Sequence, residues 1–427
     1  MSKCIIKMMK TRWLYTALMF VIAFSVAVQK TEAQVYTNPQ EVLDMYTRIA
    51  VDNNPGLRAE SAEAGASSLQ AIQARSLPNP EIEMEILTWA RNPMPDGTAF
   101  RLRAMQMIPW FGSLGQRERY YERITEAEEQ IVISSKNALI REVAERWYMM
   151  NERDHHIMIM DENIIHLTTL EQIALARLEG GGGSQVDVLR IQIERDQLIN
   201  QRDSTQRLLN ADKVRFNRLL NRDPNAQVFL FAEMVTKPLP IISSELLQES
   251  NPNLKALRLS ESAASSAVEV ARLDAKPSFG VGFMITHQSA AFVNPNGLNA
   301  IEAMVRLELP VYRTRNRARV QQAQLRQQAI RDYREELVNN LESDLMDAMQ
   351  RYTNYRETAR LYNDQLIPAL KQALSLAMTD YSYGRGTFDQ IIQLQRQLLE
   401  YEKIWSESVT NQNLAVTEIE YLTGEGQ

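Results

Sequence analysis

The chain carries the same order of motifs twice, so its fold must contain two similar halves. Self-similarity at a long period indicates a tandem duplication of a structural unit. Three motif pairs recur in the same order: NPGLRA (54–59) with NPNLKA (251–256), MQMIPWFG (105–112) with LELPVYRT (307–314), and GGGSQVDVLRIQ (181–192) with GRGTFDQIIQLQ (384–395). The run of four glycines at 180–183 therefore belongs to one member of an equivalent pair. This argues against its being a flexible linker between independent domains.

Helical periodicity fills most of each copy. Apolar residues spaced three and four positions apart predict helices over 53–77, 112–178, 184–221, 251–275, 315–381 and 387–423. At about 1.5 Å per residue, each of the two longest helices would extend roughly 100 Å, and the two shorter helices of each copy sum to about the same length. Each copy is expected to be a hairpin with one long arm and two shorter helices stacked end to end. Pro368 predicts a kink in the second long helix.

Between the first two helices of each copy, the apolar residues alternate with period two. This pattern predicts four strands, over about 80–90, 98–108, 277–287 and 299–309. One face of these strands is apolar, and the opposite face carries the charged residues Glu81, Glu83, Glu85, Arg101, Arg103, Glu302 and Arg306. Strands of about 10 residues with charges on one face only are typical of transmembrane β-barrels. The alternative is two hairpins of a soluble sheet, but the sequence offers no further strands to complete its core.

Four strands are too few to close a barrel, and open strand edges are excluded from lipid. The strands must therefore close with those of other subunits. Two copies would supply eight strands and three would supply twelve, both of which are permitted even numbers. A wide, water-filled lumen lined by the charged residues favours twelve.

The N-terminus has the features of an exported protein. A basic segment precedes a 15-residue apolar run (14–28), and Thr31-Glu32-Ala33 provides a small-x-small cleavage site, so residues 1–33 are expected to be a signal peptide. The alternative is an uncleaved membrane anchor. Cys4 is the only cysteine, so the mature chain would have no disulfide and no thiolate ligand. A formal net charge of −6 argues against a nucleic-acid partner.

The order of these motifs resembles that of the TolC-like outer-membrane efflux proteins, and the resemblance covers essentially the whole mature chain. It implies a mainly α-helical protein with a membrane β-barrel, in which three chains form twelve strands and a tunnel of helices through the periplasm. Residues 34–221 and 251–427 would be the two structural repeats, and 222–250 an equatorial linker segment. Implied partners are outer-membrane lipid, a periplasmic adaptor protein and an inner-membrane efflux pump, commonly of the resistance-nodulation-division class.

The resemblance also assigns roles to the two interhelix turns. Residues implied to contact the adaptor are Gly181, Gly182, Gly183, Ser184, Gly384, Arg385, Gly386 and Thr387. Tyr381 and Asp187 occupy positions that close the periplasmic aperture in the family. The matching acidic position of the second repeat holds Gln390, and Asp389 lies one place earlier. The gating network therefore either lacks its second acid or is rebuilt around Arg385 and Asp389.

Catalytic chemistry finds little support in the sequence. The chain has four histidines, no thiol nucleophile in the mature part and no phosphate-binding glycine loop, so we expect neither an enzyme nor a cofactor. A methionine-rich run (148–160) surrounds His155 and His156, and with Met158 these are weak candidates for a metal site. Packing positions of a long helix explain them more simply. A slight indication of heavy-metal efflux remains.

The sequence therefore predicts a passive outer-membrane channel of a tripartite efflux or type I secretion system, extending into the periplasm of a Gram-negative-type envelope. The alternative is a periplasmic adaptor protein, which also contains a helical hairpin. Adaptors lack the duplication and the paired lipid-facing strands. A coiled-coil structural protein would leave the period-two segments unexplained.

Overall fold

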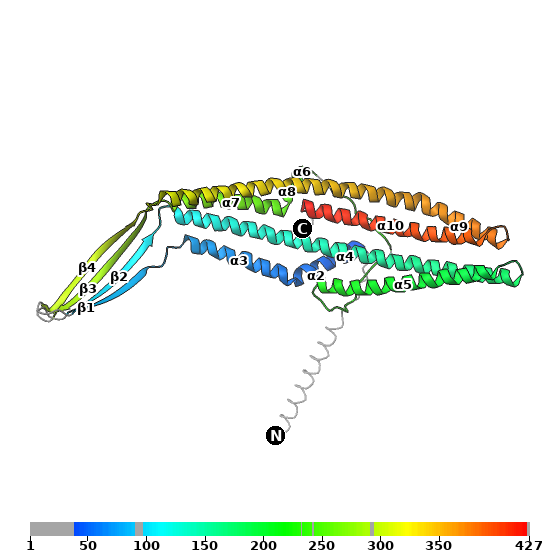
Figure 1. Ribbon diagram of the computed structural model, residues 1–427, viewed down its shortest axis with the longest axis horizontal. Helices are drawn as coiled ribbons and strands as arrows, with labels where there is room; N and C mark the ends of the chain where they lie inside the picture. The colour runs from blue at the N-terminus through cyan, green and yellow to red at the C-terminus, as the bar shows by residue number, and fades with distance from the viewer. Residues whose placement is uncertain (1–37, 90–96, 232, 241–242, 291–293, 425–427) are drawn as a thin grey trace, which may run out of the picture. The chain divides into compact units, whose positions relative to one another are not determined.

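Figure 1 shows a computed structural model of the protein, which describes residues 38–89, 97–231, 233–240, 243–290 and 294–424. The chain divides into two compact units, residues 1–45 and 46–427. The expected signal peptide lies outside the described residues. Helix α2 (Pro39–Asn53) begins in the first unit, and the sequence pattern did not predict it. Within the described residues, no helix combines the length and the apolar character needed to cross a membrane.

The second unit is mainly helical and contains one small antiparallel sheet, as the sequence predicts. The strands are β1 (Glu81–Trp89), β2 (Gly97–Ile108), β3 (Ser278–Ala290) and β4 (Asn294–Glu308). Their order in the sheet is β1-β2-β3-β4. The hairpin of the first half thus joins that of the second half through β2 and β3. In the part of the chain that the structure describes, the outer edges of β1 and β4 have no neighbouring strand.

The register of the sheet gathers apolar and charged side chains on opposite faces. Met84 lies opposite Leu102, whereas its neighbour Glu83 lies opposite Arg103. Residues directly opposite each other in a pair of strands project to the same side, so the charges of β1 and β2 share one face. The apolar face is open to solvent in the single chain. Its side chains include Ile82, Ile301 and Val305, which are 72, 80 and 81 % exposed.

Three helices of the first half form the predicted hairpin. They are α3 (Pro55–Arg75), α4 (Ser113–Glu179) and α5 (Gln185–Leu219). Helix α4 packs along both α3 and α5 (Figure 1). The repeated Asn-Pro motif starts the short helix, because the Asn54 side chain accepts a hydrogen bond from the Leu57 N–H at 3.0 Å and Pro55 occupies the first helical position, where its missing N–H costs nothing.

The second half repeats this plan. Its helices are α7 (Pro252–Leu273), α8 (Arg313–Leu361), α9 (Ile367–Ser382) and α10 (Phe388–Thr423). Helix α8 packs along α7 and α10. Asn251 caps α7 as Asn54 caps α3, accepting from the N–H groups of Asn253 and Leu254. Equivalent capping in both copies is the structural counterpart of the repeated motif.

The second long helix is not the uniform α-helix expected over 315–381. A π-helical turn, η1 (Tyr362–Leu366), separates α8 from α9. Pro368 follows directly, and a proline ring clashes with the carbonyl four residues before it while offering no N–H. The wider π turn accommodates this, with the Ile367 N–H donating to the carbonyl of Tyr362. The proline therefore acts through one turn of altered helix.

The segment between the halves is tied to both by buried asparagines. Asn151 of α4 accepts from the Phe231 N–H at 2.7 Å. Asn413 of α10 accepts from the Lys237 N–H and donates to the Val235 carbonyl, both at 2.8 Å. The segment ends in α6 (Ser244–Ser250). An extended backbone that lies against helices needs such partners, because its N–H and C=O groups are not paired with those of a neighbouring strand.

Candidate functional site

The two interhelix turns have the same backbone design. Ser184 caps α5, accepting from the Val186 N–H at 3.2 Å, and Thr387 caps α10 in a capping box with Gln390. Gly181 and Gly384 both have a φ of +76°, a conformation that costs glycine little and other residues more. The two turns thus share their positive-φ glycine and the position of the helix cap, as the repeat predicts.

Only two of the four glycines in the first turn are demanded by the backbone. Gly181 needs its positive φ. A Cβ on Gly183 would lie 2.5 Å from the Leu178 nitrogen, and one on Gly386 would lie 3.0 Å from the Tyr381 nitrogen. Gly182 has open space around it, and its counterpart in the second turn is an arginine. A side chain at Gly182 therefore fits without a backbone change.

Arg177 connects the two turns. Its guanidinium donates to the carbonyl of Tyr381 at 2.7 Å and to that of Gly182 at 3.1 Å. It also lies over the Tyr381 ring, 4.2 Å from the centroid. One side chain of α4 thus holds its own turn and the end of α9. Charge-assisted bonds of this kind are stronger than neutral ones.

Tyr381 is buried at the centre of this arrangement, with 3 % of its surface exposed. Its hydroxyl donates to the Asp187 carboxylate at a long 3.4 Å. Burial raises the pKa of Tyr381, and the charge of Asp187 raises it further. The phenol therefore stays protonated and remains a donor at neutral pH. The structure brings the predicted pair Tyr381 and Asp187 together.

Ion pairs join the returning helices α5 and α10. Arg190 pairs with Asp389, and Arg396 pairs with Glu194. The Arg190–Asp389 pair is largely exposed, so its expected contribution is below about 1 kcal/mol. Arg385 does not take part, because it pairs at 3.5 Å with Asp380 beside its own turn.

The remaining predicted tip residue, Gln390, serves the cap of α10. The acid at the matching position of the first repeat is Asp187, so the two copies use this position differently. Sequence reasoning missed Arg177 and Arg190. The equivalent positions of the second copy hold Asp380 and Gln393, so comparison of the copies offers no signal for either arginine.

The predicted lumen residues lie on one face of the sheet. Arg103 pairs with Glu83 at 2.6 Å and Arg101 with Glu85 at 3.4 Å. Arg306 of β4 lies 4.0 Å from Glu81 of β1, reaching across the two strands between them. Glu302 lies opposite Met284. The side chains of these paired residues are 34 to 69 % exposed, so the pairs contribute little to folding. Their clustering defines a polar surface.

Methionines on the same face have a packing role. A Cβ on Gly280 would lie 2.9 Å from the sulfur atom of Met105 and 2.7 Å from that of Met107. Met105 is 5 % exposed. Gly280 of β3 leaves space that these two flexible thioethers fill.

The three weak candidates for metal ligands, His155, His156 and Met158, do not form one site in the structure. His155 is buried and packs edge-on against Trp405, with ring centroids 5.5 Å apart. Met158 is half-buried on the same helix. His156 projects toward α10, where its Nε2 lies 2.7 Å from the Ser406 hydroxyl. Of the three, only His156 lies near further ligand-type side chains.

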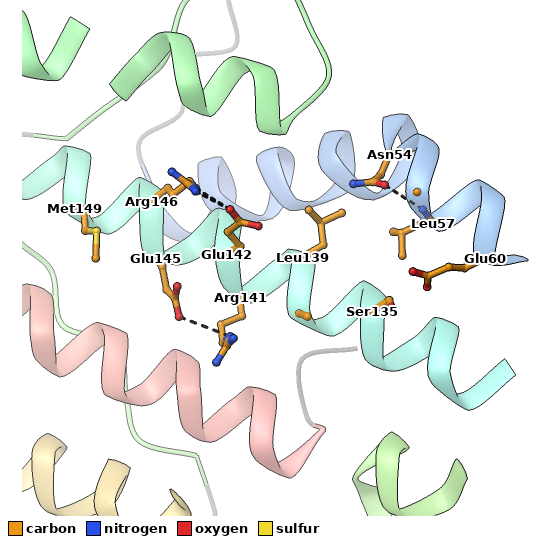
Figure 2. A pocket seen from close by; sticks show the side chains of 12 residues that line it. Asn54, Leu57, Glu60, Ser135, Leu139, Arg141, Glu142, Glu145, Arg146 and Met149 are labelled. Atoms are coloured by element: carbon orange, nitrogen blue, oxygen red, sulfur yellow. Dashed lines mark hydrogen bonds and ion pairs between the residues drawn. The ribbon is translucent and has the colours of Figure 1, made fainter. Parts of the chain in front are cut away.

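A pocket of about 720 Å³ opens between α3 and α4. Figure 2 shows that two of its acidic side chains pair with arginines along α4: Glu142 with Arg146 at 2.7 Å, and Glu145 with Arg141 at 3.7 Å. Burial raises the pKa of Glu145. The residues that line the pocket are Asn54, Gly56, Leu57, Glu60, Ser135, Ala138, Leu139, Arg141, Glu142, Glu145, Arg146 and Met149.

Comparison with solved structures shows which fold this is. The outer-membrane channel OprN aligns over 90 % of both chains with a TM-score of 0.78 and 17 % identity. CusC, a protein that forms a transmembrane channel, aligns over 92 % of this chain and 95 % of the CusC chain, with a TM-score of 0.78 and 16 % identity. The outer membrane protein VceC of Vibrio cholerae covers 90 % and 96 %, with a TM-score of 0.75 and 14 % identity. No protein-family model and no curated protein matches the sequence. At identities this low, the likeness establishes the fold.

Proposed function

We propose that this protein is the outer-membrane channel of a tripartite efflux system and conducts exported compounds passively from the periplasm to the exterior. The observation that carries the proposal is the sheet, which presents one exposed apolar face, one charged face and two open edges. No soluble arrangement of a single chain satisfies all three features, because exposed apolar strands with free edges aggregate. Lipid on the apolar face and water on the charged face satisfy the first two.

The open edges favour a homotrimer. In lipid, the free N–H and C=O groups of β1 and β4 must pair with strands of other copies. Three chains would close twelve strands, an even number permitted for such barrels. Glu81, Arg101, Arg306 and the other charged residues of that face would line its lumen.

The turns at the far end of the helices are the proposed docking and gating region. Contacts of Arg177 and Tyr381 would hold the two hairpins of each chain together and keep the aperture narrow. An adaptor protein, itself bound to an inner-membrane pump, would contact the exposed residues of the turns and release these contacts. The rival function, a periplasmic adaptor, has no observation in its favour, since the whole described fold matches that of the channels.

Docking at the turns is tested most sharply at Gly182. Replacement of Gly181 or Gly384 would strain a positive φ, whereas Gly182 has open space, so Gly182→Trp adds bulk without altering the turn. Deletion of the gene should lower tolerance to at least one compound in a panel of drugs and metal salts. The wild type and Gly182→Ala should restore tolerance; Gly182→Trp should not, although it reaches the membrane in equal amount.

The outcomes separate two ideas. A deletion strain with unchanged tolerance across the panel would count against an efflux function. Restoration by Gly182→Trp, with the deletion phenotype present, would count against adaptor docking at this turn.

A further inference from the structure

Two carboxylates and an imidazole converge between α4 and α10, away from the turns and the sheet. Glu152 and His156 are four residues apart on α4 and therefore share one face of that helix. Glu407 reaches them from α10. One ligand atom from each of the three lies within 4.8 Å of the others. In the part of the chain that the structure describes, this is the one group of at least three such ligands that lies so close together.

The two carboxylates of this group lie close to each other. Glu152 and Glu407 form no ion pair with a lysine or arginine among the described residues. The nearby Arg153 is engaged by Asp212. Two adjacent carboxylates repel each other, and a divalent cation bound between them would relieve this repulsion.

An imidazole can hold a divalent cation through one nitrogen while the other nitrogen makes a hydrogen bond. The His156 ring is half-buried where α4 meets α10. Its contact with the Ser406 hydroxyl at 2.7 Å fixes the orientation of the ring, as hydrogen bonds to metal-bound histidines do.

We propose that Glu152, His156 and Glu407 form a binding site for a divalent transition metal, with Zn²⁺ as the best match. One imidazole nitrogen and two carboxylate oxygens are ligands that Zn²⁺ accepts at about 2.0–2.2 Å. Tetrahedral coordination at that length places ligand atoms about 3.4 Å apart. The three ligand atoms lie within 4.8 Å of one another, so side-chain rotation, including that of the exposed Glu407, would have to draw them closer on binding. A fourth position remains for water. The bound ion would link α4 to α10 within one chain.

The chain provides a matched control on the same helix. Glu162 and His166 repeat the four-residue spacing of Glu152 and His156, and both are exposed. No third ligand completes a group with them among the described residues. Glu162→Gln with His166→Ala therefore removes an equal set of α4 ligands without touching the proposed site.

The test uses the full-length protein purified in detergent, stripped with a chelator, dialysed and titrated with Zn²⁺ alone. The wild type should bind one Zn²⁺ per chain and melt at a higher temperature when loaded, because a ligand of the native state stabilises it. His156→Ala and Glu407→Gln should each weaken binding at least tenfold and abolish the thermal shift. The Glu162→Gln/His166→Ala control should behave as wild type.

Glu407 is exposed, so Glu407→Gln leaves the folded core intact and keeps the experiment decisive if His156→Ala destabilises the protein. Absence of saturable Zn²⁺ binding in the wild type would overturn the proposal. So would unchanged binding in Glu407→Gln, or an equal loss in the control. The site rests on contacts within one chain and stands independently of the proposed channel function.

Discussion

Ile301→Arg is expected to abolish assembly of the protein in a membrane, whereas Glu302→Arg is expected to leave assembly intact. The two positions are adjacent at the middle of β4 and project to opposite faces of the sheet. Ile301 is 80 % exposed and pairs across the strands with Ile285. An arginine on the lipid face near the middle of a bilayer costs about 2–4 kcal/mol, and a trimer would carry three copies of the change.

Glu302 lies on the charged face opposite Met284, so an arginine there would remain in water. Membranes from cells that express each variant at equal level should be extracted with detergent. The amount of heat-resistant oligomer is the measurement. Ile301→Arg should yield almost none, and Glu302→Arg should yield as much as the wild type. Equal assembly of the two variants would show that the apolar face does not contact lipid.

Arg177→Ala is expected to open the channel at the turns. The substitution removes the hydrogen bonds to the Tyr381 and Gly182 carbonyls, at 2.7 and 3.1 Å, and the contact with the Tyr381 ring. Hydrogen bonds to a charged group contribute about 1.5–3 kcal/mol each. The surviving bond from Tyr381 to Asp187 is long, at 3.4 Å. Loss of even one such bond would raise the open population about tenfold or more.

Single-channel recording in planar bilayers measures this effect directly. Arg177→Ala should increase the open probability at least tenfold over wild type. Arg385→Ala is the control, because Arg385 contacts Asp380 and the Tyr383 ring beside the second turn and, among the described residues, makes no bridge between the hairpins. If Arg177→Ala had the open probability of the wild type, or if Arg385→Ala increased it equally, Arg177 would have no specific role in keeping the channel closed.

Much of the fold was predictable because it follows from local sequence patterns, and these patterns occur twice in the chain. The alternation of Met84 with its glutamate neighbours indicates a strand with two different faces, and the observed register preserves that division. The Asn-Pro motif signals the start of a helix by its capping chemistry alone. Pro368 marked the place where the second long helix changes, although the response is a π turn and not a simple bend.

Contacts between distant segments were beyond the reach of those patterns. Arg177 meets Tyr381 across 204 positions of sequence, and nothing in the local sequence of either residue specifies the other. The same holds for His156 and Glu407, which meet only because α4 packs on α10. The duplication also conceals such residues, since comparison of the copies highlights what they share. Helix α2 was missed because it precedes the first of the repeated motifs, NPGLRA (54–59).

The glycine run at 180–183 shows both what the repeated sequence predicts and what only the structure reveals. Repetition places it at an interhelix turn, and the structure separates the glycines that the backbone requires, Gly181 and Gly183, from Gly182, which it does not.

The number of chains in the membrane-extracted particle tests the central claim most directly. Multi-angle light scattering of the detergent-solubilised wild-type protein, corrected for bound detergent, should give three chains per particle. Three chains would supply the twelve strands that close the edges of β1 and β4. A water-soluble monomer, recovered without detergent, would contradict the account.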